Sequence, residues 1–322
     1  MGKKYNRLFE LIIDEENFEL AYQKTRRGKR RSFSYLEFKE YGALNLKHLR
    51  EEVSDGGYVI GEYRDFYITD PKVRLISALP FRDRIIQHAI NNIIEPIFDK
   101  SFLPYTFACR PGKGTHAGVI HVQSSMRKTR ASHFLKTDFS KYFPSIDRPT
   151  LYSLIEKKIS CKKTLALLKV IVPDEGKGVH IGSLSSQLWA NLYGTIADRF
   201  IHEQIKPLAW ARYMDDIVIL NDNMHHLHDT KDQLQELASD SMKLIFSKWN
   251  ISPVFMGINY LGYRIWPTHK LVRKESVKRA KRKLRNFQTH DDVIGLKKFV
   301  ASWKGHIQWA DSYNLRNKLE VS

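Results

Sequence analysis

Cysteine is scarce in this sequence, and long apolar runs are missing. The 322 residues include only two cysteines, Cys109 and Cys161, which are not spaced as C-x-x-C. A disulfide framework and a cysteine zinc site are therefore excluded, and a reducing cytoplasm is the expected location. No apolar run is long enough to cross a membrane, and the opening residues M-G-K-K-Y-N contain no apolar signal core, so no membrane partner is expected.

Acidic residues are in a clear minority. Aspartate and glutamate total 35 against 53 lysines and arginines, which gives a formal net charge of +18. Such a surface favours fast, salt-sensitive association with polyanions, so nucleic acid is the expected partner. The chain is 42% hydrophobic and 12% aromatic, which argues against a disordered protein, and its length allows two or more packed units.

Two adjacent aspartates mark the stretch from Ala209 to Leu220, which reads A-W-A-R-Y-M-D-D-I-V-I-L. The apolar and β-branched residues on either side predict two short strands, so Asp215 and Asp216 are expected at the tip of a hairpin. Adjacent carboxylates at the end of a buried strand repel each other and need a compensating charge, which a divalent cation such as Mg²⁺ supplies. A solvent-facing turn is the alternative for an isolated Asp-Asp pair.

A third carboxylate, Asp138, lies upstream in the segment His133 to Asp147, H-F-L-K-T-D-F-S-K-Y-F-P-S-I-D. The pattern predicts a short strand that ends at Asp138, before Pro144 breaks the run. Carboxylates at the ends of neighbouring strands converge even when they are far apart in the sequence. The third carboxylate therefore favours a metal site over a solvent-facing turn.

These motifs resemble those of a known family. D-F-S-K-Y-F resembles motif A of reverse transcriptases, and Y-M-D-D resembles their motif C, the palm hairpin. P-K-V-R-L-I-S-A-L-P-F-R-D-R-I-I-Q-H resembles the fingers of group II intron-like reverse transcriptases, and I-N-Y-L-G-Y-R-I resembles motif E, the primer grip. The resemblance implies an α+β right-hand polymerase fold with fingers, a palm made of an antiparallel sheet packed on helices, and a helical thumb.

The resemblance also implies an order of regions along the chain. We expect an N-terminal helical extension over residues 1–55, fingers over 56–132, motif A of the palm over 133–149, fingers and palm helices over 150–180, palm motifs B to E over 181–265, and a basic helical thumb over 266–322.

Several local elements are predicted from pattern alone. Two antiparallel strands are expected between Gly56 and Leu79, turning at Asp70 and Pro71, and an amphipathic helix is expected over Arg82–Phe98. Another amphipathic helix is expected over Thr230–Leu244. A polar loop in front of it is expected to hold the three histidines that follow motif C, His225, His226 and His228.

Two-metal nucleotidyl transfer is the mechanism that the resemblance implies. Asp138 and Asp215 are expected to bridge two Mg²⁺ ions about 3.5–4 Å apart, with Mn²⁺ able to substitute. Asp216 supports the site, and the Phe139 carbonyl completes the coordination. One ion lowers the pKa of the primer 3′-hydroxyl, and the other neutralises the triphosphate and the departing pyrophosphate.

The nucleotide-binding residues are expected from the same motifs. Arg74 matches the family's triphosphate-contacting arginine, and Lys72 is a weaker candidate. Phe143, five residues after Asp138, lies where the family places an aromatic ring that excludes a 2′-hydroxyl and so selects deoxynucleotides. Motif D of the family has a lysine that protonates pyrophosphate. Asn250 is the best-aligned position here, so Lys248 is the candidate general acid unless none serves.

Motif B departs from the common Q-G-x-x-x-S-P pattern. In V-H-I-G-S-L-S-S-Q-L-W, Ile181 replaces the usual Gln and Gln187 replaces the usual Pro, while Gly182 permits close backbone approach. Ser185 or Ser186 is expected to cap the helix that follows. This form resembles the reverse transcriptases of diversity-generating retroelements, whose DNA synthesis misincorporates opposite template adenines. A Gln at position 181 could hydrogen-bond the template strand or the incoming nucleotide, whereas Ile181 cannot. Our hypothesis is that the geometry of the newly formed base pair is therefore checked less strictly. The alternative is that Ile181 only fills apolar space.

Two clusters of basic residues are expected to contact RNA. One crowds around Gly28 in a predicted loop and comprises Arg26, Arg27, Arg30 and Arg31. The other lies on a predicted thumb helix and comprises Lys278, Arg279, Lys281 and Arg282. A merely solvated charge run is the alternative for the loop.

The sequence therefore predicts an RNA-directed DNA polymerase that makes error-prone DNA copies of a retroelement template RNA. The resemblance implies that its partners are template RNA, the duplex of RNA and new DNA, deoxynucleoside triphosphates and a small basic accessory protein. A retron-type or group II intron-type reverse transcriptase of ordinary fidelity is the first alternative. A non-catalytic RNA-binding scaffold is the second, and the intact aspartates argue against it.

Overall fold

The computed structural model describes residues 4–69 and 72–319, and the chain divides into two compact units. The first unit comprises Met1–Leu103, Ser140–Ala197 and Glu236–Ile245, and the second comprises Pro104–Phe139, Asp198–Gln235 and Phe246–Ser322. Each unit is assembled from segments that lie far apart in the sequence. All three candidate catalytic aspartates fall in the second unit.

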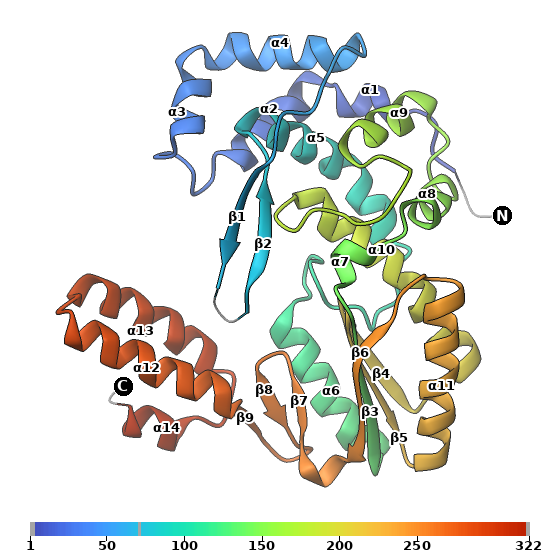
Figure 1. The fold of residues 1–322 in the computed structure, drawn as a ribbon, viewed down its shortest axis with the longest axis vertical. Helices are drawn as coiled ribbons and strands as arrows, with labels where there is room; N and C mark the ends of the chain where they lie inside the picture. Colours follow the sequence, from blue (N-terminus) through green and yellow to red (C-terminus); the bar gives the residue numbers. More distant parts are fainter. Residues whose placement is uncertain (1–3, 70–71, 320–322) are drawn as a thin grey trace. The chain divides into compact units, whose positions relative to one another are not determined.

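Helices dominate the first unit (Figure 1). They are α1 (Phe9–Ile12), α2 (Glu15–Thr25), α3 (Phe33–Glu40), α4 (Gly42–Ser54), α5 (Phe81–Asp99), α7 (Tyr142–Ser145), α8 (Arg148–Glu156), α9 (Lys162–Ile171) and most of α10 (Leu184–Phe200). The predicted helix is confirmed as α5, and α2 packs along it. Ile86, Ile90 and Ile94 share one face of α5 and are fully buried, so this face anchors the unit.

The first unit also contains a two-stranded antiparallel hairpin. Its strands are β1 (Arg64–Ile68) and β2 (Arg74–Ala78), with Phe66 opposite Ile76. This confirms the predicted strand pair, although Asp70 and Pro71, the predicted turn residues, lie outside the described residues. Every residue of β1 is exposed, so this strand adds little to the core of the unit.

A four-stranded antiparallel sheet in the order β4-β5-β3-β6 is the centre of the second unit. Its strands are β3 (His133–Phe139), β4 (Ala209–Tyr213), β5 (Asp216–Asn221) and β6 (Phe246–Pro253). A three-stranded sheet follows, with β7 (Ile258–Tyr260), β8 (Tyr263–Ile265) and β9 (Lys270–Val272). The helices are α6 (Thr115–Thr129), α12 (Lys274–Thr289), α13 (Val293–Ile307), α14 (Tyr313–Lys318) and most of α11 (Met224–Asp240).

Both sheets and the C-terminal helices of the second unit share one apolar core. Its buried members include Ala211, Val218, Leu220, Ile258, Tyr260, Ile265, Ala280, Trp303 and Ile307. Because this core runs from β4 and β5 to α12 and α13, the predicted thumb helices are packed on the sheet side chains rather than standing apart. The mixture of helices with antiparallel sheets confirms the α+β class. No helix in the described ranges is both long and apolar enough to span a membrane.

The prediction for the histidines after motif C is wrong. Helix α11 begins at Met224, so His225, His226 and His228 lie on its first turns rather than in a loop. The side chain of Asn223 explains the early start, because its Oδ1 accepts hydrogen bonds from the backbone N–H of His225 (2.9 Å) and His226 (3.2 Å). The helix also ends earlier than predicted, at Asp240.

Candidate active site

Asp138 lies near the end of β3, a strand with neighbours on both sides. Its partner across the sheet is Asp216 on β5 and, on the other side, Lys248 on β6. Directly opposed residues of antiparallel strands point to the same face of a sheet, so these three charged side chains lie side by side. The pairing of β3 with β6 shifts register just after Asp138, and such irregularities are frequent beside active sites.

The adjacent aspartates lie at the tip of the β4–β5 hairpin, as predicted. Strand β4 ends at Tyr213 and β5 begins at Asp216, so Asp215 is a turn residue. Met214 before it has a left-handed backbone with φ of 55°. Behind the turn, the side chains of Ile217, Val218 and Ile219 are fully buried. The strand is therefore fixed in the core while both carboxylates stay half-buried.

Lys136 supplies part of the compensating charge that the carboxylates need. Its Nζ lies 3.0 Å from Asp216 Oδ2. Burial raises the pKa of Asp216 to about 7, the charges of Asp138 and Asp215 add to this increase, and Lys136 opposes it. We did not single out Lys136 from the sequence. Side chains alternate between the two faces of a strand, so Lys136, two residues before Asp138, could have been predicted to lie on the same face as Asp138.

The raised pKa of Asp216 predicts a pH-dependent cost to stability in metal-free protein. The folded-state pKa of about 7 exceeds the usual value of about 3.9, so the folded chain binds more protons between these pH values and its free energy of unfolding falls as the pH rises through them. Asp216→Asn removes this effect. At pH 8 with a chelator, we expect the variant to be more stable than wild type by roughly 2–4 kcal/mol, and at pH 5 by less.

Thermal unfolding at the two pH values tests this expectation. Asp222→Asn is the matched control, because Asp222 is exposed and follows the same strand, β5. It should unfold like wild type at both pH values. Parallel unfolding of Asp216→Asn and wild type across the whole range would show that burial of Asp216 carries no such cost.

Lys248, the candidate general acid, lies beside Asp138, whereas Asn250 lies opposite Lys136. The Lys248 side chain is exposed, so it has room to move toward a bound substrate. Its neighbour Ser247 donates a hydrogen bond from Oγ to the Asp138 carbonyl (3.0 Å), which ties β6 to the end of β3. The structure therefore brings Lys248 to the carboxylates, and its role in proton transfer stays a prediction.

The carboxylate cluster fits a hard divalent cation. Its donors are oxygen atoms, and Asp216 Oδ1 is buried without a hydrogen-bond partner among the described residues. Across residues 4–69 and 72–319, no three His, Cys, Asp or Glu side chains are grouped closely enough to hold a metal ion by themselves. Mg²⁺ needs no such group, because it usually binds one or two carboxylates and completes its shell with substrate phosphates and water.

The candidate nucleotide-binding residues lie in the first unit. They are Lys72, Arg74, Phe143, Ile181, Gly182 and Gln187. Arg74 is the first residue of β2, Lys72 precedes it, and both side chains are exposed. Gln187 is exposed on the first turn of α10. These three are therefore accessible to a ligand.

The motif B loop connects several of these residues through its backbone. Ser77 of β2 donates its N–H to the Ile181 carbonyl (2.9 Å), and Val179 donates its N–H to the Phe143 carbonyl (2.9 Å). Gly182 has φ of 111°, and a Cβ there would lie 3.0 Å from the Ser77 carbonyl oxygen. Only glycine suits this close approach. The structure thus brings Ile181 and Gly182 against β2 and joins their loop to Phe143.

Gln87 fixes the start of α10, a role that we did not predict. Its Nε2 donates to Ser183 Oγ (2.7 Å), and its Oε1 accepts from the N–H of Leu184 (3.0 Å). The prediction that Ser185 or Ser186 caps this helix is wrong, because both lie inside it. Gln87 could have been singled out from the sequence, because it is the last residue of the motif R-D-R-I-I-Q, which resembles a motif in the fingers of the family.

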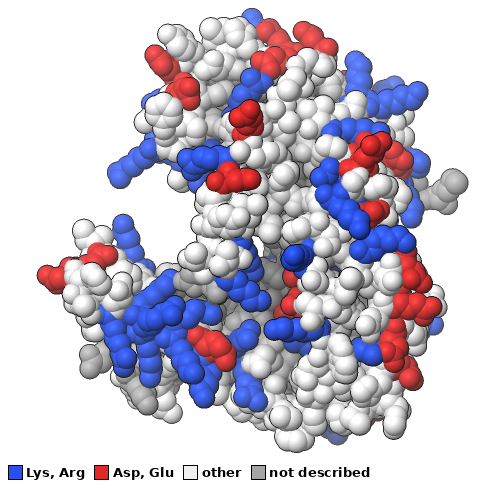
Figure 2. Space-filling view, in the orientation of Figure 1, with Lys and Arg blue, Asp and Glu red and all other residues white. Residues whose placement is uncertain are grey.

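The two basic clusters are solvent-accessible, one in each unit. The first lies in the turn between α2 and α3, where Arg27, Arg30 and Arg31 are exposed and Arg26 is half-buried. The second lies on α12, where Lys278 and Arg282 are exposed and Arg279 and Lys281 are half-buried. Figure 2 shows lysine and arginine side chains gathered over α12. Its apolar side, with Ala280 buried, packs into the core of the second unit.

Residues 69–265 match the family of reverse transcriptases (RNA-dependent DNA polymerases). The match covers well over half of the chain and includes both strand-end motifs, β3 with Asp138 and the β4–β5 hairpin with Asp215 and Asp216. The chain therefore belongs to the reverse transcriptase family, whose members are RNA-directed DNA polymerases.

Individual relatives share less of the sequence. Protein YkfC of Escherichia coli (strain K12) is 25% identical over 283 residues, which cover 73% of this chain and 73% of YkfC. The group II intron-encoded protein LtrA of Lactococcus lactis is 24% identical over 213 residues, covering 61% of this chain and 35% of LtrA. A solved telomerase from Candida albicans, in complex with a fragment of telomeric RNA, has 10% identity and a TM-score of 0.49, covering 67% of this chain and 46% of that one. The chain thus spans less than half the length of LtrA and of that telomerase chain.

Proposed function

We propose that this reverse transcriptase makes error-prone DNA copies of a retroelement template RNA, with errors concentrated at template adenines. The observation that carries the proposal is Ile181 at the position where the common family motif has Gln. The peptide at Ile181 is held by the hydrogen bond from Ser77 N–H, and the side chain is half-buried. An isoleucine fixed at that position offers no hydrogen bond to a template base or nucleotide.

The second unit supplies the groups for nucleotidyl transfer. Asp138, Asp215 and the Phe139 carbonyl would hold the divalent ions, and Asp216, paired with Lys136, keeps negative charge beside them. The ions would supply charge neutralisation and a lowered pKa for the primer 3′-hydroxyl. Lys248 is the donor that we assign to the departing pyrophosphate, because it is exposed and lies opposite Asp138.

The first unit supplies the groups for choosing the nucleotide. Arg74 and Lys72 are exposed cations that bind the triphosphate, and an arginine can contact two phosphate oxygens at once. Phe143 places its ring against the sugar and disfavours a ribonucleotide. The Phe143 carbonyl accepts a hydrogen bond from Val179 N–H in the motif B loop. The residues assigned to sugar selection and to checking of the base pair are therefore joined through the backbone.

Infidelity follows from the missing hydrogen bond. A polar side chain that hydrogen-bonds only a correctly placed base adds roughly 1–3 kcal/mol to the free-energy difference between a correct and a mismatched base pair. An apolar side chain makes no such contribution. The polymerase should therefore accept mismatched pairs more readily.

The proposal also assigns regions and partners. In this proposal, the fingers, palm and thumb have the predicted boundaries. The thumb helix α12 binds the duplex of template RNA and new DNA through its cationic side chains. The turn with Arg26 and Arg27 binds the RNA backbone. A small basic accessory protein assists synthesis on the element's own RNA.

Sequencing of cDNA made on a primed RNA template that contains all four bases tests the fidelity proposal. In Mg²⁺, we expect errors at adenines to exceed those at the other bases by about tenfold, and Ile181→Gln to lower the adenine errors by about tenfold, the effect of one hydrogen bond. Ile181→Val, which keeps an apolar side chain, is the matched control and should keep the adenine errors.

Accurate copying at adenines by wild type would contradict this proposal and favour a retron-type or group II intron-type enzyme of ordinary fidelity. The similarity to LtrA favours that alternative at the level of the family. Absence of any product, even with the cognate RNA and accessory protein present, would instead favour the RNA-binding scaffold.

A further inference from the structure

Arg212 is a charged residue inside an apolar strand. It lies on β4 between Ala211 and Tyr213, and its side chain is fully buried. Asp198, at the end of α10, is equally buried, and the two side chains form an ion pair. Burying two charges costs free energy unless the two side chains are well aligned and their remaining polar atoms form hydrogen bonds.

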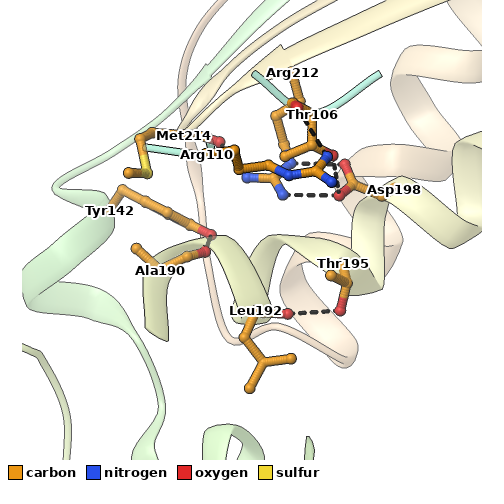
Figure 3. Close-up of polar contacts among 9 residues, drawn as sticks. All are labelled: Thr106, Arg110, Tyr142, Ala190, Leu192, Thr195, Asp198, Arg212 and Met214. Carbon is orange, nitrogen blue, oxygen red and sulfur yellow. Dashed lines mark hydrogen bonds and ion pairs between the residues drawn. The ribbon is translucent and has the colours of Figure 1, made fainter. Parts of the chain in front are cut away.

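The guanidinium of Arg212 bridges Asp198 and the catalytic turn (Figure 3). Its Nε donates to Asp198 Oδ1 (2.6 Å) and its Nη2 donates to Asp198 Oδ2 (2.8 Å), a bidentate pairing. Its Nη1 donates to the backbone carbonyl of Met214 (3.0 Å). Arg212 therefore holds the residue that immediately precedes Asp215.

Met214 needs such a contact because its backbone is strained. Its φ of 55° lies in the left-handed region, which costs a residue other than glycine roughly 1–2 kcal/mol. The side chain is buried, so the surrounding core also restricts it. A change in the backbone dihedral angles of Met214 would change the position and orientation of Asp215, the next residue in the turn.

The segment from Tyr105 to Phe107 holds Arg212 from the outer edge of β4. The N–H of Arg212 donates to the Tyr105 carbonyl and the N–H of Phe107 donates to the Arg212 carbonyl, both at 2.9 Å. Thr106 donates from Oγ1 to Asp198 Oδ2 (3.1 Å). Backbone and side chain of Arg212 are thus fixed at the same time, and the guanidinium has little freedom to leave the Met214 carbonyl.

We infer that Arg212 is a positioning residue for the polymerase reaction. Its ion pair with Asp198 keeps the guanidinium in place, and its bond to the Met214 carbonyl holds the left-handed backbone that fixes the position of Asp215, which would serve as a metal ligand. This inference rests on the proposed function of Asp215 as a metal ligand. A purely stabilising role would not require the charges, since a buried ion pair is often replaced by apolar residues of similar volume without loss of stability.

The decisive variant is Arg212→Met with Asp198→Leu, which removes both buried charges together. We expect its melting temperature to stay within a few degrees of wild type, because neither charge is left unpaired. Binding of Mn²⁺, measured by electron paramagnetic resonance on the full chain without substrate, should weaken by about 10- to 100-fold, the usual effect of losing a group that orients a metal ligand. The single-turnover rate of nucleotide addition should fall by a similar factor.

Two further variants keep the test decisive. Arg212→Lys keeps the charge but cannot reach Asp198 and Met214 together, so it should weaken Mn²⁺ binding even if the double variant fails to fold. Arg82→Met with Glu52→Leu is the matched control, because it removes another arginine–carboxylate pair, in the first unit. This control should bind Mn²⁺ and add nucleotides like wild type.

The outcomes separate this inference from the proposed function. Unchanged Mn²⁺ binding and unchanged rate in both Arg212 variants would overturn the positioning role, whatever their stability. Weakened Mn²⁺ binding in a protein whose wild type makes no DNA would support the positioning role and overturn the polymerase proposal.

Discussion

Asp138→Asn is expected to lower the rate of DNA synthesis on RNA by at least about 10³-fold. The metal ions of a two-metal site lower the barrier by several kcal/mol, and each 1.4 kcal/mol is a factor of ten in rate. The amide of asparagine carries no charge, so it holds a divalent ion weakly. Asp215→Asn should have an effect of the same size, because Asp215 is the other carboxylate assigned to both ions. Single-turnover addition of one deoxynucleotide measures both variants.

Folding and RNA binding are the controls for this result. Removing one of three neighbouring carboxylates lowers their mutual repulsion, so both variants should unfold at or above the wild-type temperature in metal-free buffer. RNA affinity should stay within about twofold of wild type, since neither aspartate lies in a basic cluster. A variant that keeps more than a tenth of the wild-type rate would refute the assignment of its aspartate.

Neutralising the α12 cluster should have the second largest effect. Changing Lys278, Arg279, Lys281 and Arg282 to Gln removes four of the cationic side chains of this helix. Each lost phosphate contact reduces the salt dependence of binding by roughly 0.7–0.9 in logarithmic slope. We therefore expect the affinity for an RNA–DNA duplex to fall about 100-fold near 0.1 M salt, and the slope to fall by about 3.

A second set of four lysines provides the matched control. Changing Lys157, Lys158, Lys162 and Lys163 to Gln alters the net charge by the same amount at the end of α8 and the start of α9. Titration of a labelled duplex at several salt concentrations should show a small loss of affinity and nearly the wild-type slope. Equal losses for both sets would mean that α12 contributes only general positive charge and is no duplex-binding surface.

The aspartates were predictable because their signal is local. An apolar run that stops at a carboxylate predicts the end of a strand. The turn with Asp215 lies where the pattern indicated, and the strand with Asp138 ends one residue later than predicted, at Phe139. The antiparallel hairpin of β1 and β2 and the helix α5 were predicted for the same reason. Strong periodicity within a few turns or strands needs no tertiary information.

The supporting residues depended on tertiary pairing that one sequence does not reveal. Gln87 anchors Leu184, which lies 97 residues away, and the partner of Arg212 lies on a helix that ends before β4. A buried arginine in an apolar strand does demand an acidic partner, but no pattern identifies which acid. Asn223 differs, because it is a local cap signal that we overlooked in favour of a later helix start.

Extension of a primer on an RNA template by the purified full chain is the first experiment to make. With Mg²⁺ and deoxynucleoside triphosphates, we expect DNA products that a chelator abolishes. With ribonucleoside triphosphates alone we expect little extension, because the proposed role of Phe143 is to disfavour a 2′-hydroxyl. Equal use of both nucleotide types would contradict the role of Phe143. Failure to extend any RNA template, with cognate RNA and accessory protein supplied, would contradict the central claim that these carboxylates form a polymerase active site.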